Sequence, residues 1–331
     1  MFGFRRLAPG AAMVLSLTLA GCQGPVVLVF APEAQELLPV VRSALPAVER
    51  QTGLRFTVAA PNTVPPSEAL YFSADTPTPE DLAALPVVPV SPDGLGLVPA
   101  LVRRGQPLPL FWDVPGITVF SDEWPAGGFS EDPRRWVDPA RGWPRVRALV
   151  IGGADPGLRL MAWLGQSGSD GSLPTTKMFQ EFRMWLERWD DGAWKTTRAQ
   201  IAPKYRGGRG QAFIETAKDF HQTAPGSDRR FFPLISLQAG TRRWGGSVLA
   251  LEARGGDAAG KAARAWATPL TETGFQKEFH ERTGWLPATL AAGDQKLPAE
   301  VTVFTSTASV TPAVRDQLET LFFPVGTLGN R

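Results

Sequence analysis

Tryptophan and carboxylate side chains stand together at several points of this chain, in combinations that can bind a polar small molecule. The sequence has eleven tryptophans and only two tyrosines, so the indole is the polar aromatic group that it mainly offers. An indole can stack on the C–H face of a polyhydroxylated ring, while an ionised carboxylate accepts hydrogen bonds from hydroxyls at the ring's edge. The candidate residues for such a site are Ser73, Asp75, Trp112, Asp113, Trp244, Gly245, Gly246 and Trp285, followed by Trp163.

These candidates also have structural interpretations, and both interpretations stay open at this point. Trp112 and Trp244 suit a pocket wall and ordinary core packing equally well. Asp75 can cap a loop, and Asp113 can form a salt bridge beside a hinge. The glycine pair 245–246 lets a backbone approach a ligand or bend between two lobes. Core packing is the better interpretation for Trp185, Trp189 and Trp266.

Residues for other chemistries are scarce. His221 and His280 are the only histidines, and the sequence contains no H-x-x-x-H spacing, no G-x-S-x-G elbow and no phosphate-binding glycine loop. We therefore expect no enzyme activity, no cofactor and no metal site. A glycosidase needs only two carboxylates, so it stays open as the alternative enzyme. The segment 206–210 holds two arginines among glycines, occurs once and predicts a solvated loop rather than a nucleic-acid site.

The N-terminus has the pattern of an export signal. Arg5 and Arg6 precede an apolar stretch at 11–20, which is too short for a comfortable transmembrane helix. Small residues then lead to Cys22, the single cysteine of the chain. The pattern resembles a bacterial lipobox, which implies removal of residues 1–21, lipid on Cys22 and a position in the cell envelope, outside the cytoplasmic membrane. An ordinary signal peptide is the alternative.

Composition and length describe a folded protein of more than one core. Hydrophobic residues make up 43% and charged residues 20% of the 331 residues, with a net charge of +2. This charge gives no basic field for nucleic acid. The chain that follows the leader is long for a single compact core and suits two lobes.

The elements at the start of the chain predict a parallel sheet. The continuous apolar run 26–30 is typical of a buried parallel strand, and a helical pattern follows it at 37–48. Pro39 and Pro46 should kink or split this helix, and Gly53 should end it. A second strand at 54–58 completes a right-handed βαβ unit. A third apolar run at 69–72 leads into Ser73.

Helices predominate in the later elements. The clearest pattern spans 174–189, and we expect its apolar face in the core. That face consists of Met178, Phe179, Phe182, Trp185, Leu186 and Trp189. Asp257 and Thr271 are predicted to cap two helices, and Gly284 to end the second. A strand at 301–304 and a helix at 312–322 should follow.

Several segments together resemble a known family, because they occur in the family's order and spacing. The sequence resembles the sugar-type extracellular solute-binding proteins that serve ABC importers. The resemblance rests on segments 26–58, 72–75, 109–113, 119–122, 244–251 and 258–290, the last of which contains Thr283-Gly284-Trp285-Leu286-Pro287. It is absent at 124–171, and Ser121 stands where the family usually has asparagine.

The resemblance implies a two-lobed, periplasmic-binding-protein-like α/β fold with a hinge between the lobes. The expected division is lobe I at 22–108 and about 258–292, lobe II at about 109–257 and 293–331, and hinge crossovers near 109–120 and 244–251. It also implies a monomer that captures a small polar ligand for an ABC permease. A neutral polyol or sugar is the default ligand, with an organic anion or a polyamine as alternatives. An envelope lipoprotein of this fold without a transport role stays open as well.

Overall fold

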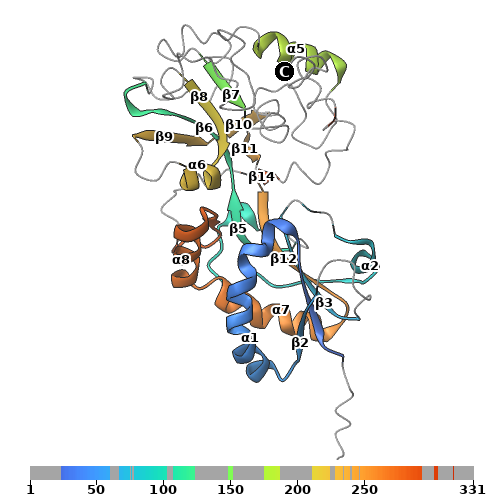
Figure 1. Ribbon diagram of the computed structural model, residues 1–331. Coiled ribbons are helices and arrows are strands. Elements are labelled where there is room, and N and C mark those ends of the chain that lie inside the picture. Colours follow the sequence, from blue (N-terminus) through green and yellow to red (C-terminus); the bar gives the residue numbers. More distant parts are fainter. Residues whose placement is uncertain are drawn as a thin grey trace, which may run out of the picture.

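A computed structural model shows two β-rich parts, one above the other in Figure 1. The structure describes residues 24–59, 67–74, 76, 78–102, 107–123, 148–151, 175–186, 211–223, 228–233, 235–238, 241–245, 247–292, 302–304 and 316. No helix among them combines the length and the apolar composition needed to cross a membrane.

The lower part is built on a mixed sheet, to which the described residues contribute seven strands. These are β1 (Val26–Phe30), β2 (Phe56–Ala59), β3 (Ala69–Ser73), β4 (Val87–Val88), β5 (Leu108–Asp113), β12 (Ser247–Arg254) and β13 (Leu286–Pro287). Their order is β13-β5-β12-β3-β1-β2, with β4 also on β12. β1 pairs in parallel with β2 and β3, whereas β12 runs antiparallel to β3 and β5.

The first helical region divides where proline enters it. A 3-10 helix, η1 (Pro32–Leu37), passes directly into α1 (Leu38–Thr52). Pro39 lies in the first turn of α1, where its missing N–H costs nothing, while Pro46 lies inside the helix. The predicted split is therefore confirmed. Gly53 ends α1 with a φ of 69°, as predicted, and β2 begins at Phe56, two residues later than expected.

Helices α7 (Asp257–Leu270) and α8 (Thr273–Thr283) follow β12 and complete the core of the lower part, while the short α2 (Glu80–Ala83) and the 3-10 turn η2 (Pro99–Leu101) lie in its connections. Trp266 of α7 is fully buried, which confirms its interpretation as a core residue. The rings of Phe30 and Phe72, on neighbouring parallel strands, stack with centroids 4.5 Å apart. Phe279 of α8 is also buried and packs 4.4 Å from the Phe111 ring.

The predicted caps of α7 and α8 are wrong. Gly256 precedes α7 as its N-cap, and Asp257 is the first helical residue. The carboxylate of Glu68 instead accepts hydrogen bonds from the N–H groups of Gly256 and Ala259. Thr271 closes α7 by donating its hydroxyl to a carbonyl one turn back. A cap can come from any part of the chain, so helix patterns alone did not reveal Glu68.

The upper part contains two smaller sheets. The first consists of β6 (Pro115–Phe120), β7 (Ala148–Ile151), β8 (Gln211–Thr216) and β9 (Arg229–Pro233), in the order β7-β8-β6-β9. The second consists of β10 (Ile235–Gln238), β11 (Thr241–Gly245) and β14 (Thr302–Phe304). The turn η3 (Ser121–Glu123) follows β6, and helix α6 (Ala217–Thr223) follows β8 directly.

Helix α5 (Thr176–Leu186) lies at the top of the upper part and matches the predicted helix, with shorter ends (Figure 1). Phe182 is fully buried, and Met178 and Phe179 are partly buried. The burial of these three residues agrees with the prediction that the apolar face of this helix lies in the core. The remaining side chains of the stripe lie outside the described residues, as does nearly all of the predicted helix at 312–322.

Among the described elements the chain passes between the two parts three times, and two of these crossings are neighbours. The third lies between β13 of the lower part and β14 of the upper part. β5 leads through Val114 into β6, and β11 returns to β12 across residue 246. Asp113 and Ser247 are partners in the β5–β12 ladder, so the two crossings lie side by side. Both β5 and β12 pair within the lower sheet, whereas the expected division assigned 109–257 to lobe II. β5 is buried along its whole length and therefore belongs with the lower core. The exact lobe boundaries stay a prediction.

Candidate ligand-binding site

Three strands end at the edge of the lower sheet that faces the crossings. β1 and β3 are parallel, and β3 and β5 are both antiparallel to β12, so all three point the same way. Their last residues are Phe30, Ser73 and Asp113. In open α/β sheets ligands bind outside the carboxyl ends of the strands. This edge is therefore the candidate ligand site.

The carboxylate of Glu33 organises the turn after β3. Its Oε1 accepts the N–H groups of Ala74 and Thr76, both at 2.9 Å, and its Oε2 accepts the Thr76 hydroxyl at 2.8 Å. Glu33 itself follows β1 in η1. Glu33 thus links the loop after β1 to the loop after the neighbouring strand β3, and it binds that second loop at the residues just before and just after position 75. Asp75 lies outside the described residues.

These bonds change the titration of Glu33. Partial burial by itself would raise the pKa of this carboxyl, but the hydrogen bonds from Ala74 and Thr76 outweigh it and hold the pKa below its ordinary value of 4.5. Close by, burial raises the pKa of Tyr71 to about 12, and the negative charge of Glu33 adds to this rise. Glu33 is therefore ionised and Tyr71 protonated at neutral pH, which leaves this edge negatively charged.

Asp113 holds the first crossing in place. Its side chain is 6% exposed, and Oδ1 accepts the N–H groups of Val114 at 2.9 Å and Lys218 at 3.0 Å. Lys218 is the second residue of α6, so Asp113 caps the first turn of this helix. The carboxylate thus joins the end of β5 to a helix of the upper part. In this structure Asp113 fixes the backbone at the crossing.

Trp285 takes part in a second link between the two parts. Its indole N–H donates to Oε2 of Glu36 at 2.9 Å, and the same oxygen accepts Nζ of Lys218 at 2.9 Å. The Lys218 ammonium also lies 4.9 Å from the Trp285 ring centroid. Trp285 is 3% exposed. Its position is therefore that of a packed interlobe residue.

Trp112 lies in the core of the lower part. Its side chain is 2% exposed, and its indole N–H donates to the carbonyl of Pro287 at 3.0 Å. Of the two interpretations open in the sequence, this structure favours core packing. The reason is long-range, because β13 returns to pair with β5 and brings the Pro287 carbonyl to the indole N–H.

The other candidates are only partly described. Ser73 is half-buried at the end of β3, and its hydroxyl is hydrogen-bonded to Tyr71. The backbones of Trp244 and Gly245 lie in β11, beside the second crossing. The side chain of Trp244 is outside the described residues, as are Cys22, Trp163 and Gly246.

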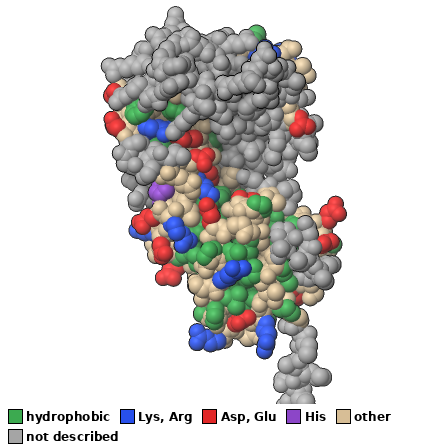
Figure 2. Space-filling view, viewed as in Figure 1, with side chains coloured by type: hydrophobic (Ala, Val, Ile, Leu, Met, Phe, Trp, Pro, Cys, Tyr) green, Lys and Arg blue, Asp and Glu red, His purple; other side chains and the backbone are tan. Residues whose placement is uncertain are grey.

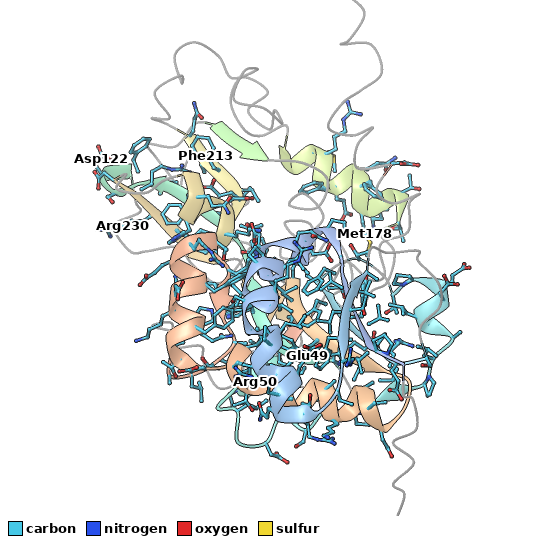
Figure 3. All side chains as sticks on the ribbon, turned by 60° about the horizontal axis from the view of Figure 1, so that its bottom comes forward. Glu49, Arg50, Asp122, Met178, Phe213 and Arg230 are labelled. Atoms are coloured by element: carbon cyan, nitrogen blue, oxygen red, sulfur yellow. The ribbon has the colours of Figure 1, made fainter. Side chains whose placement is uncertain are left out.

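Glu33, Glu36 and Lys218 are important residues here that the sequence patterns did not indicate. One signal was available for Glu33, since it comes three residues after the buried run 26–30, and polar residues after parallel strands meet at one sheet edge. No local pattern pointed to Lys218. Ser121 accepts a hydrogen bond from Arg230 at 3.2 Å, and Figure 3 shows Arg230 and Asp122 on the same side of the molecule.

The described residues hold no group of three or more His, Cys, Asp or Glu side chains arranged to bind a metal ion. This observation concerns only that part of the chain.

Comparisons of the sequence with known proteins found no match. No family model matches it, and no curated protein does.

Comparison of the structure found many similar folds, of which three show the range. A cyclic α-maltosyl-1,6-maltose binding protein from Arthrobacter globiformis has a TM-score of 0.55 and 14% identity, covering 90% of this chain and 94% of that one. A spermidine/putrescine ABC transporter substrate-binding protein from Streptococcus pneumoniae has a TM-score of 0.54 and 11% identity, covering 90% and 97%. Thiaminase I from Bacillus thiaminolyticus has a TM-score of 0.55 and 14% identity, covering 90% and 98%.

The fold is that of periplasmic binding proteins. The predicted two-lobed α/β architecture is thereby confirmed. At these identities the similarity concerns the fold alone. Thiaminase I is similar in fold to the same chain as the two binding proteins, so fold does not decide between binding and turnover.

Proposed function

We propose that this protein is an extracytoplasmic solute-binding lipoprotein that captures a small polar ligand and delivers it to an ABC permease. The observation that carries the proposal is the polar edge of the lower sheet, placed beside two neighbouring crossings in a periplasmic-binding-protein fold. Lipid on Cys22, a monomeric state and a position in the envelope belong to the same proposal. They rest on the leader pattern and on the role of such folds.

The ligand class that we favour is a sugar or oligosaccharide. Glu33 and Asp113 hold the backbone at this edge, where Ser73 offers a hydroxyl that both donates and accepts and Asp75, in this proposal, an acceptor-only carboxylate. Such groups match the hydroxyls of a sugar. Because Trp112 and Trp285 are buried, stacking falls mainly to Trp244 in this proposal, with Gly245 and Gly246 allowing close approach and Asp75 binding the ring edge.

A polyamine is the second candidate ligand. The ionised Glu33 makes this edge negative, which favours ammonium groups, and a polyamine-binding protein shares the fold. The two ligand classes differ in salt dependence. Binding of a polyamine should weaken steeply as the salt concentration rises, whereas binding of a neutral sugar should not.

Capture would proceed by bending at the two neighbouring crossings. A ligand that contacts both lobes binds the closed form better than the open form, and only this difference in affinity can shift the equilibrium. The closed form is then the state that a permease recognises. No covalent step takes place in this mechanism.

A thermal-shift screen of neutral oligosaccharides and polyamines tests the proposal. A ligand present at about one hundred times its Kd should stabilise the native state by about 2.7 kcal/mol, which raises the Tm by several degrees. Small-angle scattering should show a more compact protein in the presence of the same compound. Turnover of a chromogenic glycoside, lost on replacement of single carboxylates, would contradict the binding role and support a glycosidase.

A further inference from the structure

Helices α6 and α8 form a contact between the upper and lower parts of the molecule. α6 packs on the upper strands β6, β8 and β9, and it also touches α8 of the lower part. We call this contact the clasp. It consists of Lys218, His221 and Gln222 of α6 together with Glu36, His280, Glu281, Thr283, Gly284 and Trp285 of the lower part. Histidine atoms, purple in Figure 2, reach the surface near the junction of the two parts.

The clasp is fastened by side chains of α6 that bind the end of α8. His221 Nε2 lies 2.9 Å from the carbonyl of Glu281, and Nε2 of Gln222 donates to the carbonyl of Thr283 at 2.9 Å. Lys218 binds Glu36. The last turn of a helix leaves carbonyls without partners inside the helix, and α6 supplies donors for two of them.

Gly284 allows the two helices to approach closely. A Cβ atom at this position would lie 2.8 Å from the carbonyl oxygen of Lys218 and 3.0 Å from Cβ of His221. Contacts this short require glycine. The end of α8 is therefore shaped to receive α6.

The only two histidines of the chain face each other in the clasp. Their ring centroids are 5.1 Å apart. Carbonyl oxygens only accept, so His221 donates through Nε2 to Glu281, and His280 donates through Nδ1 to Trp285 at 3.0 Å. An added proton must then go to the second nitrogen of each ring, which makes both rings cationic.

The surrounding elements carry carboxylates and cations in nearly equal numbers. They are Glu36, Asp113, Glu215, Lys218, Asp219, Arg229, Arg230, Lys277, Glu278, Glu281 and Arg282. Glu36 already binds Lys218, and Glu215 already binds Arg229. The Asp113 carboxylate accepts two backbone N–H groups. Protons on both rings leave their N–H bonds to the two carbonyls in place, but they set two like charges against each other in rings whose centroids are 5.1 Å apart.

We propose that the clasp holds the lobes in the orientation of this structure and that mild acid releases it by charging His221 and His280. Histidine is the side chain that ordinarily changes its charge between pH 5 and 8. The inference concerns the lobes alone and needs no ligand, so it can fail while the proposed function stands.

Interlobe distances measured by electron spin resonance test this proposal. Spin labels go on Arg50→Cys in α1 and Asp122→Cys after β6, two exposed positions labelled in Figure 3, in the full chain with Cys22→Ser. From pH 7.5 to pH 5.5 we expect the ratio of released to clasped molecules to rise about tenfold, allowing for solvent screening of the two charges. An unchanged distance distribution would overturn the proposal.

The matched control is H221Q/H280Q, because glutamine retains an N–H donor but cannot gain a charge at these pH values. Its distance distribution should stay the same at both pH values, and a response equal to that of the parent would also overturn the proposal. K218M, which breaks the bond to Glu36, should release the clasp already at pH 7.5.

Imidazole NMR of the unlabelled protein gives a second measurement that is independent of variant folding. The two histidines should give two ring signals whose titrations are coupled. Two independent single-site titrations would show that the rings do not sense each other, and that result counts against the proposal.

Discussion

At the scale of single residues, one carboxylate positions the turn on which ligand capture is proposed to depend. Glu33 receives three hydrogen bonds from the turn after β3, so its ionised form stabilises the native backbone there. Its folded-state pKa lies below the ordinary value of 4.5. The stabilisation is therefore fully present above the unfolded-state pKa and is lost as the pH falls through the folded-state pKa.

The first prediction concerns Glu33→Gln. At pH 7 we expect this variant to lose about 1–2 kcal/mol of unfolding free energy, because an amide cannot accept all three bonds. At pH 3 the difference from the parent should be smaller, since the Glu33 carboxyl is then increasingly protonated and neutral, as glutamine always is. Urea unfolding at the two pH values measures this. Glu278→Gln on the exposed face of α8 is the control and should have little effect at either pH. Equal losses at pH 7 and pH 3 would contradict the assigned role.

At the scale of elements, two glycines end helices in the same conformation but in different surroundings. Gly53 ends α1 with a φ of 69°, and Gly284 ends α8 with a φ of 80°. Nothing lies within 4 Å of a Cβ atom placed at Gly53, whereas one at Gly284 meets the backbone of α6. The first glycine is needed for conformation alone, and the second also for packing.

The second prediction compares Gly53→Ala with Gly284→Ala. The left-handed conformation should cost each variant about 1–2 kcal/mol. Gly284→Ala should lose a further amount of about 1–3 kcal/mol, because overpacking forces α6 away from α8. Denaturant unfolding measures both losses. Equal losses in the two variants would mean that α6 moves aside without a cost in free energy. That result would contradict a tight contact between α6 and α8 at Gly284.

At the scale of the whole molecule, the neighbouring crossings and the N-terminal leader define how the protein is proposed to work. Two strands side by side permit one lobe to turn on the other, and a lipid at Cys22 would keep this movement at a membrane surface. The described residues offer no membrane-spanning helix. In this proposal the lipid on Cys22 attaches the protein to the membrane.

The third prediction is that Cys22→Ser releases the protein from the membrane. A serine hydroxyl cannot receive the thioether-linked lipid, so the variant should appear in the soluble envelope fraction or the medium. Fractionation followed by immunoblotting measures this, with Cys22→Ser alone compared against the parent. Retention of the variant in the membrane fraction would refute the lipid anchor.

Much of the lower part could be predicted from the sequence, because its signals are local. The buried run 26–30 became β1 with the predicted bounds, and Gly53 and Gly284 ended helices as expected. These features depend on continuous hydrophobicity or on a backbone conformation that only glycine adopts readily. Neighbours within a few residues are enough to produce them.

The candidate site was less predictable, because its side chains are defined by distant partners. The tryptophan at 112 looked equally suited to a pocket and a core until Pro287, far along the chain, was found to accept its N–H. The role of Lys218 depends on Glu36, and the pairing of the two histidines on the approach of α6 to α8.

The sequence by itself thus determined the leader pattern, the parallel-strand start and the glycines that end α1 and α8, and it indicated the fold class. Only the tertiary structure decided which tryptophans are buried, which backbone groups each carboxylate binds and where the two lobes touch. The physical reason is that hydrophobic periodicity and glycine conformation act over a few residues. Burial and hydrogen bonding depend instead on which distant segments the fold brings together.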